Sequence, residues 1–171
     1  MRKSTRRVVT GHDAGGKSVA VSDGPPPQHH PMHGEAVGAD FHEMWGDADT
    51  VPELTLRVGR EPNERPFTIM PVSGHLLRIL DVYPLKDGGK RTAMHRTRTL
   101  DYVVVIEGEL VLILDDSELI LKPGDVVVQR GTDHAWENRS GQIARAAFFH
   151  IDARFSAELL AKLPQPLILT R

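Results

Sequence analysis

The stretch DYVVVIEGELVLILDDSELILKPGDVVVQR, residues 101–130, decides the fold class of this chain. It consists of short runs rich in valine, isoleucine and leucine, separated by glycine, proline or pairs of acidic residues. Such runs are typical of β-strands joined by tight turns. Similar runs lie before it at 75–84 and after it at 134–139 and 143–152, with no helical pattern between them. The pattern therefore predicts an all-β domain, an antiparallel sandwich or barrel.

The bulk composition fits a single globular domain with an extension. The 171 residues include 21 lysines and arginines, 23 aspartates and glutamates and no cysteine, and the net charge is −2. This balance gives no global attraction for nucleic acid or an anionic membrane, so neither is expected as a partner. No disulfide can form, and no apolar run resembles a membrane span or a secretory signal. We expect a cytoplasmic protein.

Proline divides the chain before the strand-rich part. In GPPPQHHPMH, residues 24–33, four prolines exclude a helix or a central strand and predict a linker or arm. The stretch FHEMW, residues 41–45, fits either a strand or a helical turn. We therefore expect residues 1–71 to form an N-terminal extension of short strands and this arm, packed on the barrel or on a partner subunit.

The barrel itself is expected at residues 72–154, followed by a short C-terminal helix and tail at 155–171. The stretch FSAELLAKL, residues 155–163, is the one amphipathic helical pattern, and Pro164 ends it.

One short motif suggests a different function. GHDAGGKS, residues 11–18, matches the phosphate-binding loop of nucleotide hydrolases, and LVLILDD, residues 110–116, resembles their acidic magnesium-binding strand. A phosphate loop must lead into a helix whose N-terminus holds the phosphates. Here the residues that follow, 19–27, are VAVSDGPPP, and their proline run excludes a helix. Residues 110–121 fit a hairpin that turns at 115–117. We expect a surface turn at 13–16 and no nucleotide cofactor.

Two longer patterns point to a known family. They are GKRTAMHRTRTLDYVVVIEGEL, residues 89–110, and PGDVVVQRGTDHAWEN, residues 123–138. Together they resemble the two motifs of the cupin superfamily, and the resemblance spans residues 74–152. The matching positions are Gly89, His95 and Gly108 in the first motif, and Gly124, Gly131, His134 and Asn138 in the second. The resemblance implies a double-stranded β-helix barrel of the jelly-roll kind.

The chain departs from the family pattern where metal is usually held. Metal-binding cupins use two histidines and a glutamate from the first motif and a histidine from the second. Here Thr97 replaces the second histidine and Asp101 the glutamate, while Gln129 stands where proline is usual and the second motif is one residue short. A threonine hydroxyl is a poor ligand for a divalent ion, but it can orient a water or a carboxylate.

His95, Asp101 and His134 are the candidate catalytic and metal-binding residues. His95 and Thr97 are two apart on one strand, so both should face the barrel interior. Two histidines and a carboxylate can hold iron or zinc, and the resemblance adds manganese and nickel. Aspartate is shorter than glutamate, however, so Asp101 fits equally well as the orienting partner of a histidine. The same residues could form a metal-free acid–base site or a purely structural pair.

Other residues are weaker candidates. Thr97, Trp136 and His75 are predicted to contact substrate; Trp136 shares a face with His134, whereas the faces of His75 and His150 cannot be assigned from the sequence. Tyr102 should point away from Asp101. His29, His30 and His33 could bind metal, but in a proline-rich segment they are more simply interpreted as a solvated arm.

The function that these features predict is a small-molecule cupin enzyme, metal-dependent, of lyase, hydrolase, isomerase or dioxygenase type. The alternatives are a metal-free acid–base enzyme and a non-catalytic module that binds or senses a ligand. No helix-turn-helix pattern accompanies the barrel, so a DNA-binding regulator is not expected. The family resemblance also implies a homodimer to which the N-terminal segment contributes.

Overall fold

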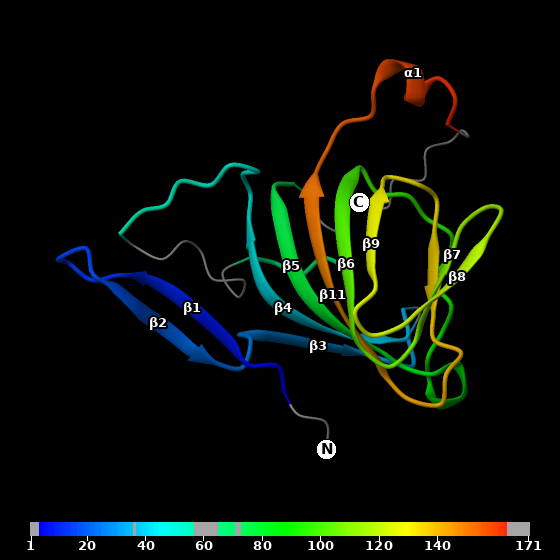
Figure 1. The fold of residues 1–171 in the computed structure, drawn as a ribbon, viewed down its shortest axis with the longest axis horizontal. Coiled ribbons are helices and arrows are strands. Elements are labelled where there is room, and N and C mark those ends of the chain that lie inside the picture. Colours follow the sequence, from blue (N-terminus) through cyan, green and yellow to red (C-terminus); the bar gives the residue numbers. More distant parts are fainter. Residues whose placement is uncertain (1–3, 36, 57–64, 71–72, 164–171) are drawn as a thin grey trace.

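The computed structural model describes residues 4–35, 37–56, 65–70 and 73–163. These residues form two principal sheets, a separate hairpin, a 3-10 turn and one short helix (Figure 1). The strands are β1 (Arg7–His12), β2 (Ser18–Gly24), β3 (Gln28–Met32), β4 (Ala39–Asp47), β5 (His75–Val82), β6 (Thr99–Glu107), β7 (Leu110–Ile113), β8 (Glu118–Leu121), β9 (Val126–Arg130), β10 (Ala135–Glu137) and β11 (Ala144–Asp152). The 3-10 turn η2 (Leu85–Asp87) follows β5.

The two principal sheets are antiparallel and share one apolar core. The larger sheet has the strand order β3-β4-β5-β11-β6-β9, and the smaller has the order β10-β7-β8. Val103 and Phe148 from the larger sheet pack with Leu112 and Trp136 from the smaller one. The rings of Trp136 and Phe148 meet edge to face, with centroids 5.5 Å apart. This arrangement confirms the predicted all-β, double-stranded β-helix fold.

Two strands of the larger sheet come from the segment before residue 71. The stretch FHEMW lies in β4, which pairs with β5, so the strand alternative is the correct one. β3 pairs with β4 at the sheet edge, with Pro31 opposite Asp40. The prediction of a linker or arm at residues 24–33 was therefore wrong for Gln28–Met32, because an edge strand leaves one side unpaired and tolerates a proline. The expected boundary at residues 71 and 72 falls outside the described residues.

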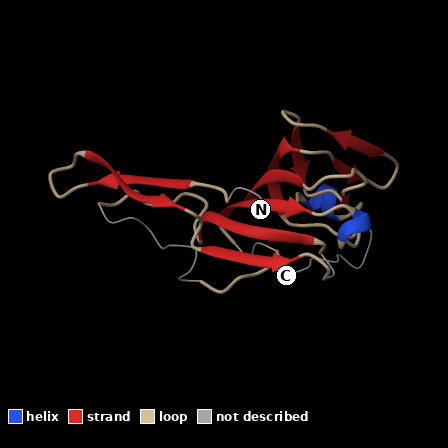
Figure 2. Cartoon of the chain, turned by 90° about the horizontal axis from the view of Figure 1, so that it is seen from below, coloured by secondary structure: helices blue, strands red, loops and turns tan. Residues whose placement is uncertain are grey.

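β1 and β2 form a hairpin that extends away from the barrel (Figures 1 and 2). Its turn is fixed by Asp13, whose Oδ1 accepts hydrogen bonds from the backbone N–H groups of Gly15 and Lys17. The stretch GHDAGGKS is thus strand, turn and strand, which confirms the predicted surface turn. The predicted hairpin at 110–121 is confirmed too, as β7 pairs with β8.

The C-terminal helix α1 (Ala157–Leu160) is shorter than the predicted 155–163. It begins at Ser156, whose Oγ accepts a hydrogen bond from the backbone N–H of Leu159. After Leu160, the N–H of Ala161 donates to the C=O of Ala157, and the N–H groups of Lys162 and Leu163 both donate to the C=O of Leu159. Pro164 lies outside the described residues. No helix in the described part of the chain is long and apolar enough to cross a bilayer.

Candidate functional site

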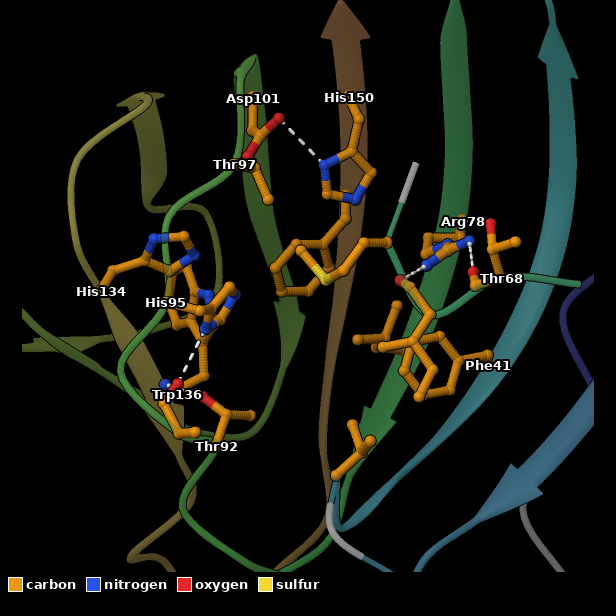
Figure 3. A pocket seen from close by; sticks show the side chains of 16 residues that line it. Phe41, Thr68, Arg78, Thr92, His95, Thr97, Asp101, His134, Trp136 and His150 are labelled. Carbon is orange, nitrogen blue, oxygen red and sulfur yellow. Dashed lines mark hydrogen bonds and ion pairs between the residues drawn. The ribbon is translucent and has the colours of Figure 1, made fainter. Parts of the chain in front are cut away.

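A cavity of about 500 Å³ lies within the barrel. Its apolar wall is formed mainly by Phe41, Leu80, Trp136 and Phe148. Five polar side chains line the part formed by β6, β11 and the segments before β6 and β10 (Figure 3): His95, Thr97, Asp101, His134 and His150. An apolar wall with a few polar groups is the usual composition of a site for a small organic ligand.

His95 and His134 are held side by side at this cavity by their own backbones. The N–H of each donates to the C=O of the other, both at 2.9 Å, and their ring centroids lie 4.3 Å apart. The first cupin motif and the second cupin motif thus meet at one antiparallel bridge. The side chain of Trp136 lies against His134, with ring centroids 5.9 Å apart.

Each of the two rings has a fixed tautomer. The Nδ1 of His95 lies 2.8 Å from the carbonyl oxygen of Ala93, and the Nδ1 of His134 lies 2.9 Å from that of Thr132. A carbonyl oxygen can only accept, so each Nδ1 must carry the hydrogen. Each Nε2 therefore keeps a lone pair that can accept a proton or a hydrogen bond from a ligand.

The environment keeps His134 neutral. Burial is the largest cause and the neighbouring His95 the next, and together they lower the pKa of His134 from 6.5 to about 4 against the opposing effect of its backbone partner, Thr132. Burial and the adjacent His95 ring therefore both disfavour a positive charge on His134 at neutral pH.

Asp101 and His150 form a second polar pair in the same cavity. They lie opposite each other on β6 and β11, with only 3% and 8% of their surfaces exposed. Asp101 Oδ1 and His150 Nδ1 are 2.9 Å apart, in a geometry that does not align them as a hydrogen bond (Figure 3). Thr97, the residue at the altered histidine position, is buried nearby and accepts a hydrogen bond of 2.7 Å from the hydroxyl of Thr99.

The three predicted metal ligands do not fit a metal centre in this arrangement. His95 and His134 each offer an Nε2, but the carboxylate of Asp101 is engaged by His150. Among the described residues, no group of three or more histidine, aspartate or glutamate side chains is placed to hold a metal ion. The shorter side chain of aspartate, one methylene less than the family glutamate, accounts for this difference, since metal bonds demand short distances.

The other predicted site residues divide between the cavity and the outside. Trp136 and Thr97 line the cavity, whereas His75 does not. His75 starts β5, where its Nδ1 lies 3.1 Å from the carbonyl oxygen of Asp49, on the face away from the interior. The prediction that His75 contacts substrate in this cavity therefore needs correction. Tyr102 is 38% exposed, on the face opposite to Asp101, as predicted.

The N-terminal histidines do not form a free, solvated arm. His29 stacks on His42, His30 stacks on Phe67, and the Nδ1 of His33 lies 2.8 Å from Asp40. These contacts dock β3 on the sheet, since edge strands are stabilised by side-chain cover as well as by pairing.

Two residues of the cavity were not identified from the sequence. The side chain of His150 points into the barrel, and this direction follows only from the pairing of β11 with β5 and β6. Both strands are far from β11 in the sequence. Arg78, on β5, is buried beside Glu43, with Nε and Oε1 3.0 Å apart, and donates to the carbonyl oxygens of Thr68 and Ile69. An arginine flanked by Leu77 and Ile79 within a strand is the signal that could have indicated it.

Comparison with known proteins agrees with this architecture. The family model described as a cupin domain matches residues 82–151. Phomopsin biosynthesis cluster protein D of Diaporthe leptostromiformis is 37% identical over 163 residues, covering 89% of this chain and 80% of that protein. The cupin-domain-containing oxidoreductase virC of Hypocrea virens is 36% identical over 148 residues, covering 81% and 70%.

Among solved structures, an RmlC-like cupin from Shewanella frigidimarina is 14% identical, covers 74% of this chain and 85% of that one, and superimposes with a TM-score of 0.49. The family assignment rests on the sequence relatives, which are more than 30% identical over most of both chains. The chain belongs to the cupin family.

Proposed function

We propose that this protein is a biosynthetic enzyme that binds a small, largely apolar metabolite in the barrel and catalyses a proton transfer, as in an isomerisation or elimination. The observation that carries the proposal is the His95–His134 pair, with rings 4.3 Å apart and both Nδ1 atoms committed to backbone carbonyls. Two Nε2 atoms with free lone pairs, in a cavity with an apolar wall, can exchange protons with a bound substrate.

The cavity and the relatives support the substrate class. A volume of about 500 Å³ lies within the range of sites for small organic molecules. Phe41, Trp136 and Phe148 offer aromatic surface to the apolar body of the ligand, and the histidines face its polar group. The relative from Diaporthe is named for a biosynthesis cluster, which favours a metabolite of a dedicated pathway over a substrate of central metabolism.

The residues of this chain suffice for a balanced proton transfer. An Nε2 takes a proton from the substrate, and the electron pair of the broken bond forms a new double bond within it. The protonated ring then returns the proton to another atom of the substrate, so no oxidant or reductant is consumed. Because the two rings are adjacent, one protonated ring can donate while its neutral neighbour accepts.

Deuterium exchange into small ketones tests the proposal and does not require the natural substrate. The protein is incubated in D2O containing EDTA with a panel of one-ring aryl ketones, with and without an α-hydroxyl group, and NMR follows deuterium entering the acidic C–H position. We expect exchange faster than with free imidazole at the same concentration, and at least ~10-fold slower in His95→Asn and His134→Asn. Asparagine Nδ2 can still donate to the backbone carbonyl that His Nδ1 now contacts, so each variant removes Nε2 alone.

Binding without exchange across the whole panel would contradict the proposal and favour the non-catalytic binding module. Equal exchange in wild type and both variants would contradict the roles of His95 and His134. A variant that fails to bind as well as to exchange would be checked for folding by circular dichroism before its rate is interpreted.

A metal-dependent oxidoreductase is the second candidate, and the name of the virC relative favours it. Its metal site would require Asp101 to leave His150 and join His95 and His134. Elemental analysis tests this after exposure to ferrous iron, manganese, nickel and zinc in turn. One equivalent of one metal in the wild type, lost in His95→Ala and His134→Ala, would support this candidate over metal-free proton transfer.

A further inference from the structure

We propose that His150 is a second proton-transfer residue of the cavity, positioned by Asp101, and that it removes the proton from a substrate carbon that carries a hydroxyl group. The inference rests on the proposed function and adds to it a third histidine, a positioning carboxylate and a substrate class, the α-hydroxy ketones.

The register of the sheet brings the two side chains together inside the barrel. Asp101 on β6 is directly opposite His150 on β11, and both line the cavity. Figure 3 shows the ring of His150 with one nitrogen toward Asp101 and the other on the opposite side of the ring. The ring also stacks on Phe148, with centroids 6.2 Å apart, which limits its rotation.

The pair has the chemistry of a base with its orienting partner. With Nδ1 directed at the carboxylate, the Nε2 of His150 is the atom left to accept a proton, and the negative charge of Asp101 stabilises the imidazolium that results. Asp101 Oδ1 and His150 Nδ1 make no aligned hydrogen bond although both are fully buried. Buried polar atoms left in this condition in a native fold need an explanation, and a role in proton transfer supplies one.

The position of His150 separates two tasks within the cavity. His95 and His134 come from the segments before β6 and β10, whereas His150 comes from β11. His95, His134 and His150 nevertheless all line the same cavity, so the three rings face one shared space. A substrate in that space can present its oxygen atoms to His95 and His134 and a C–H bond to His150.

The free Nε2 atoms select the substrate class. A neutral Nε2 accepts a hydrogen bond and cannot donate one, so His95 and His134 favour a hydroxyl over a bare carbonyl. In an α-hydroxy ketone, His150 takes the carbinol proton and the C–H electron pair forms the double bond of an enediol. His95 and His134 move the hydroxyl proton from one oxygen of the substrate to the other. His150 then returns its proton to the former carbonyl carbon. The isomerisation therefore consumes no oxidant or reductant.

Racemic 2-hydroxy-1-phenylpropan-1-one in D2O with EDTA is the probe. NMR measures deuterium entering the carbinol position and formation of the isomeric hydroxy ketone. Affinity is measured separately with 2-hydroxy-2-methyl-1-phenylpropan-1-one, which has no carbinol hydrogen and cannot react. His150→Asn keeps an N–H toward Asp101 and removes the proton acceptor, and Asp101→Asn removes the negative charge and keeps the size.

We expect His150→Asn to lower the exchange rate ~100-fold with the Kd of the unreactive analogue changed less than threefold. Asp101→Asn should lower the rate at least ~10-fold at unchanged Kd, because the ring loses its orienting charge. The 15N spectrum of the His150 ring should show the Nδ1–H form in the wild type and a mixture of tautomers in Asp101→Asn. The loss of rate at unchanged Kd is the readout that a purely structural carboxylate would not give.

The outcomes separate this inference from the proposed function. A wild-type rate in His150→Asn, with a loss of rate in His134→Asn, would overturn the role of His150 and leave the proposed function standing. No exchange by the wild type on the hydroxy ketone, with exchange on a simple ketone, would overturn the substrate class. If His150→Asn does not fold, His150→Gln serves instead, since it removes the base with a longer side chain in the same space.

Discussion

The buried Arg145–Asp81 pair on the outer face of the larger sheet and the buried Asp101–His150 pair on its inner face differ in how fully their polar groups are satisfied. On the outer face, Arg145 donates two hydrogen bonds of 2.7 Å to Asp81, and the Nε2 of His42 lies 3.3 Å from the same carboxylate. On the inner face, Asp101 and His150 share a single contact of 2.9 Å and border the cavity.

The difference shows that burial of charge alone does not mark a functional residue. The outer pair uses the forked geometry of arginine, so the guanidinium and the carboxylate are occupied by one another. The inner pair leaves the Nε2 of His150 directed at a space that a ligand can enter. A candidate catalytic pair is distinguished from a structural one by unsatisfied hydrogen-bonding groups and by access from a cavity, and not by how deeply it is buried.

Breaking the outer pair should have the largest effect on stability. Arg145→Met leaves the carboxylate of Asp81 buried without its bidentate partner, and we expect the free energy of unfolding to fall by ~3 kcal/mol. Urea denaturation followed by circular dichroism measures the loss. Adding Asp81→Asn should recover much of it, because no charge then remains buried. A double variant no more stable than Arg145→Met would show that the lost packing of the arginine, and not the stranded charge, causes the effect.

On the cavity side, His134 should make stability depend on pH. Its pKa is 6.5 when unfolded and about 4 when folded. Above pH 6.5 neither state binds the proton, between 6.5 and 4 only the unfolded state does, and below 4 both do. Stability is therefore lost as pH falls through this window, by up to ~3 kcal/mol in total.

The measurement is the free energy of unfolding of metal-free protein at pH 7 and pH 4.5. His134→Asn cannot take up the proton, so its loss between these pH values should be smaller than that of the wild type. Parallel losses in the two proteins would show that His134 does not cause the pH dependence.

Asp101→Asn should affect stability much less than Arg145→Met, although Asp101 is the more deeply buried of the two. A histidine whose carboxylate partner is removed need not carry a charge, whereas the carboxylate of Asp81 keeps its charge when Arg145 is removed. We expect a change of ~1 kcal/mol or less at pH 7. A loss as large as that of Arg145→Met would assign Asp101 to the structure instead of to the reaction.

The sequence could predict the fold well because the strands are local features. Alternating or continuous valine, isoleucine and leucine marked β5 to β11, and the glycine positions of the motif have steric causes. At Gly89, for example, a Cβ would lie 1.9 Å from the carbonyl oxygen of Tyr83. β3 was missed because a proline run obscures an edge strand, whose pairing with β4 depends on contacts that composition does not encode.

The site could be predicted only where one strand or one motif places it. The spacing of His95, Thr97 and His134 indicated their common side of the barrel correctly. The partner of Asp101 could not be predicted, because β6 and β11 are far apart in the chain and nothing local fixes their register. His150 and His75 lie on different strands of the same sheet, and the pairing alone decides that the first faces inward.

Substitutions on the exposed part of the outer face should have the smallest effect on the free energy of unfolding. This face is also where we expect a homodimer to form. Tyr102 and Val104 of β6 lie directly opposite Val128 and Val126 of β9, and all four are 37–59% exposed. They form a continuous apolar strip, and such patches commonly mark interfaces.

Combining Val104→Lys with Val128→Lys should therefore shift the protein from dimer to monomer in sedimentation equilibrium, while the unfolding free energy of the monomer changes by ~0.5 kcal/mol or less. Val19→Lys puts the same substitution on the projecting hairpin and serves as the matched control. If Val19→Lys dissociates the protein and the strip variant does not, the hairpin is the interface. The apolar strip of the outer face would then be ordinary solvent-exposed surface, and the inner face alone would carry a binding function.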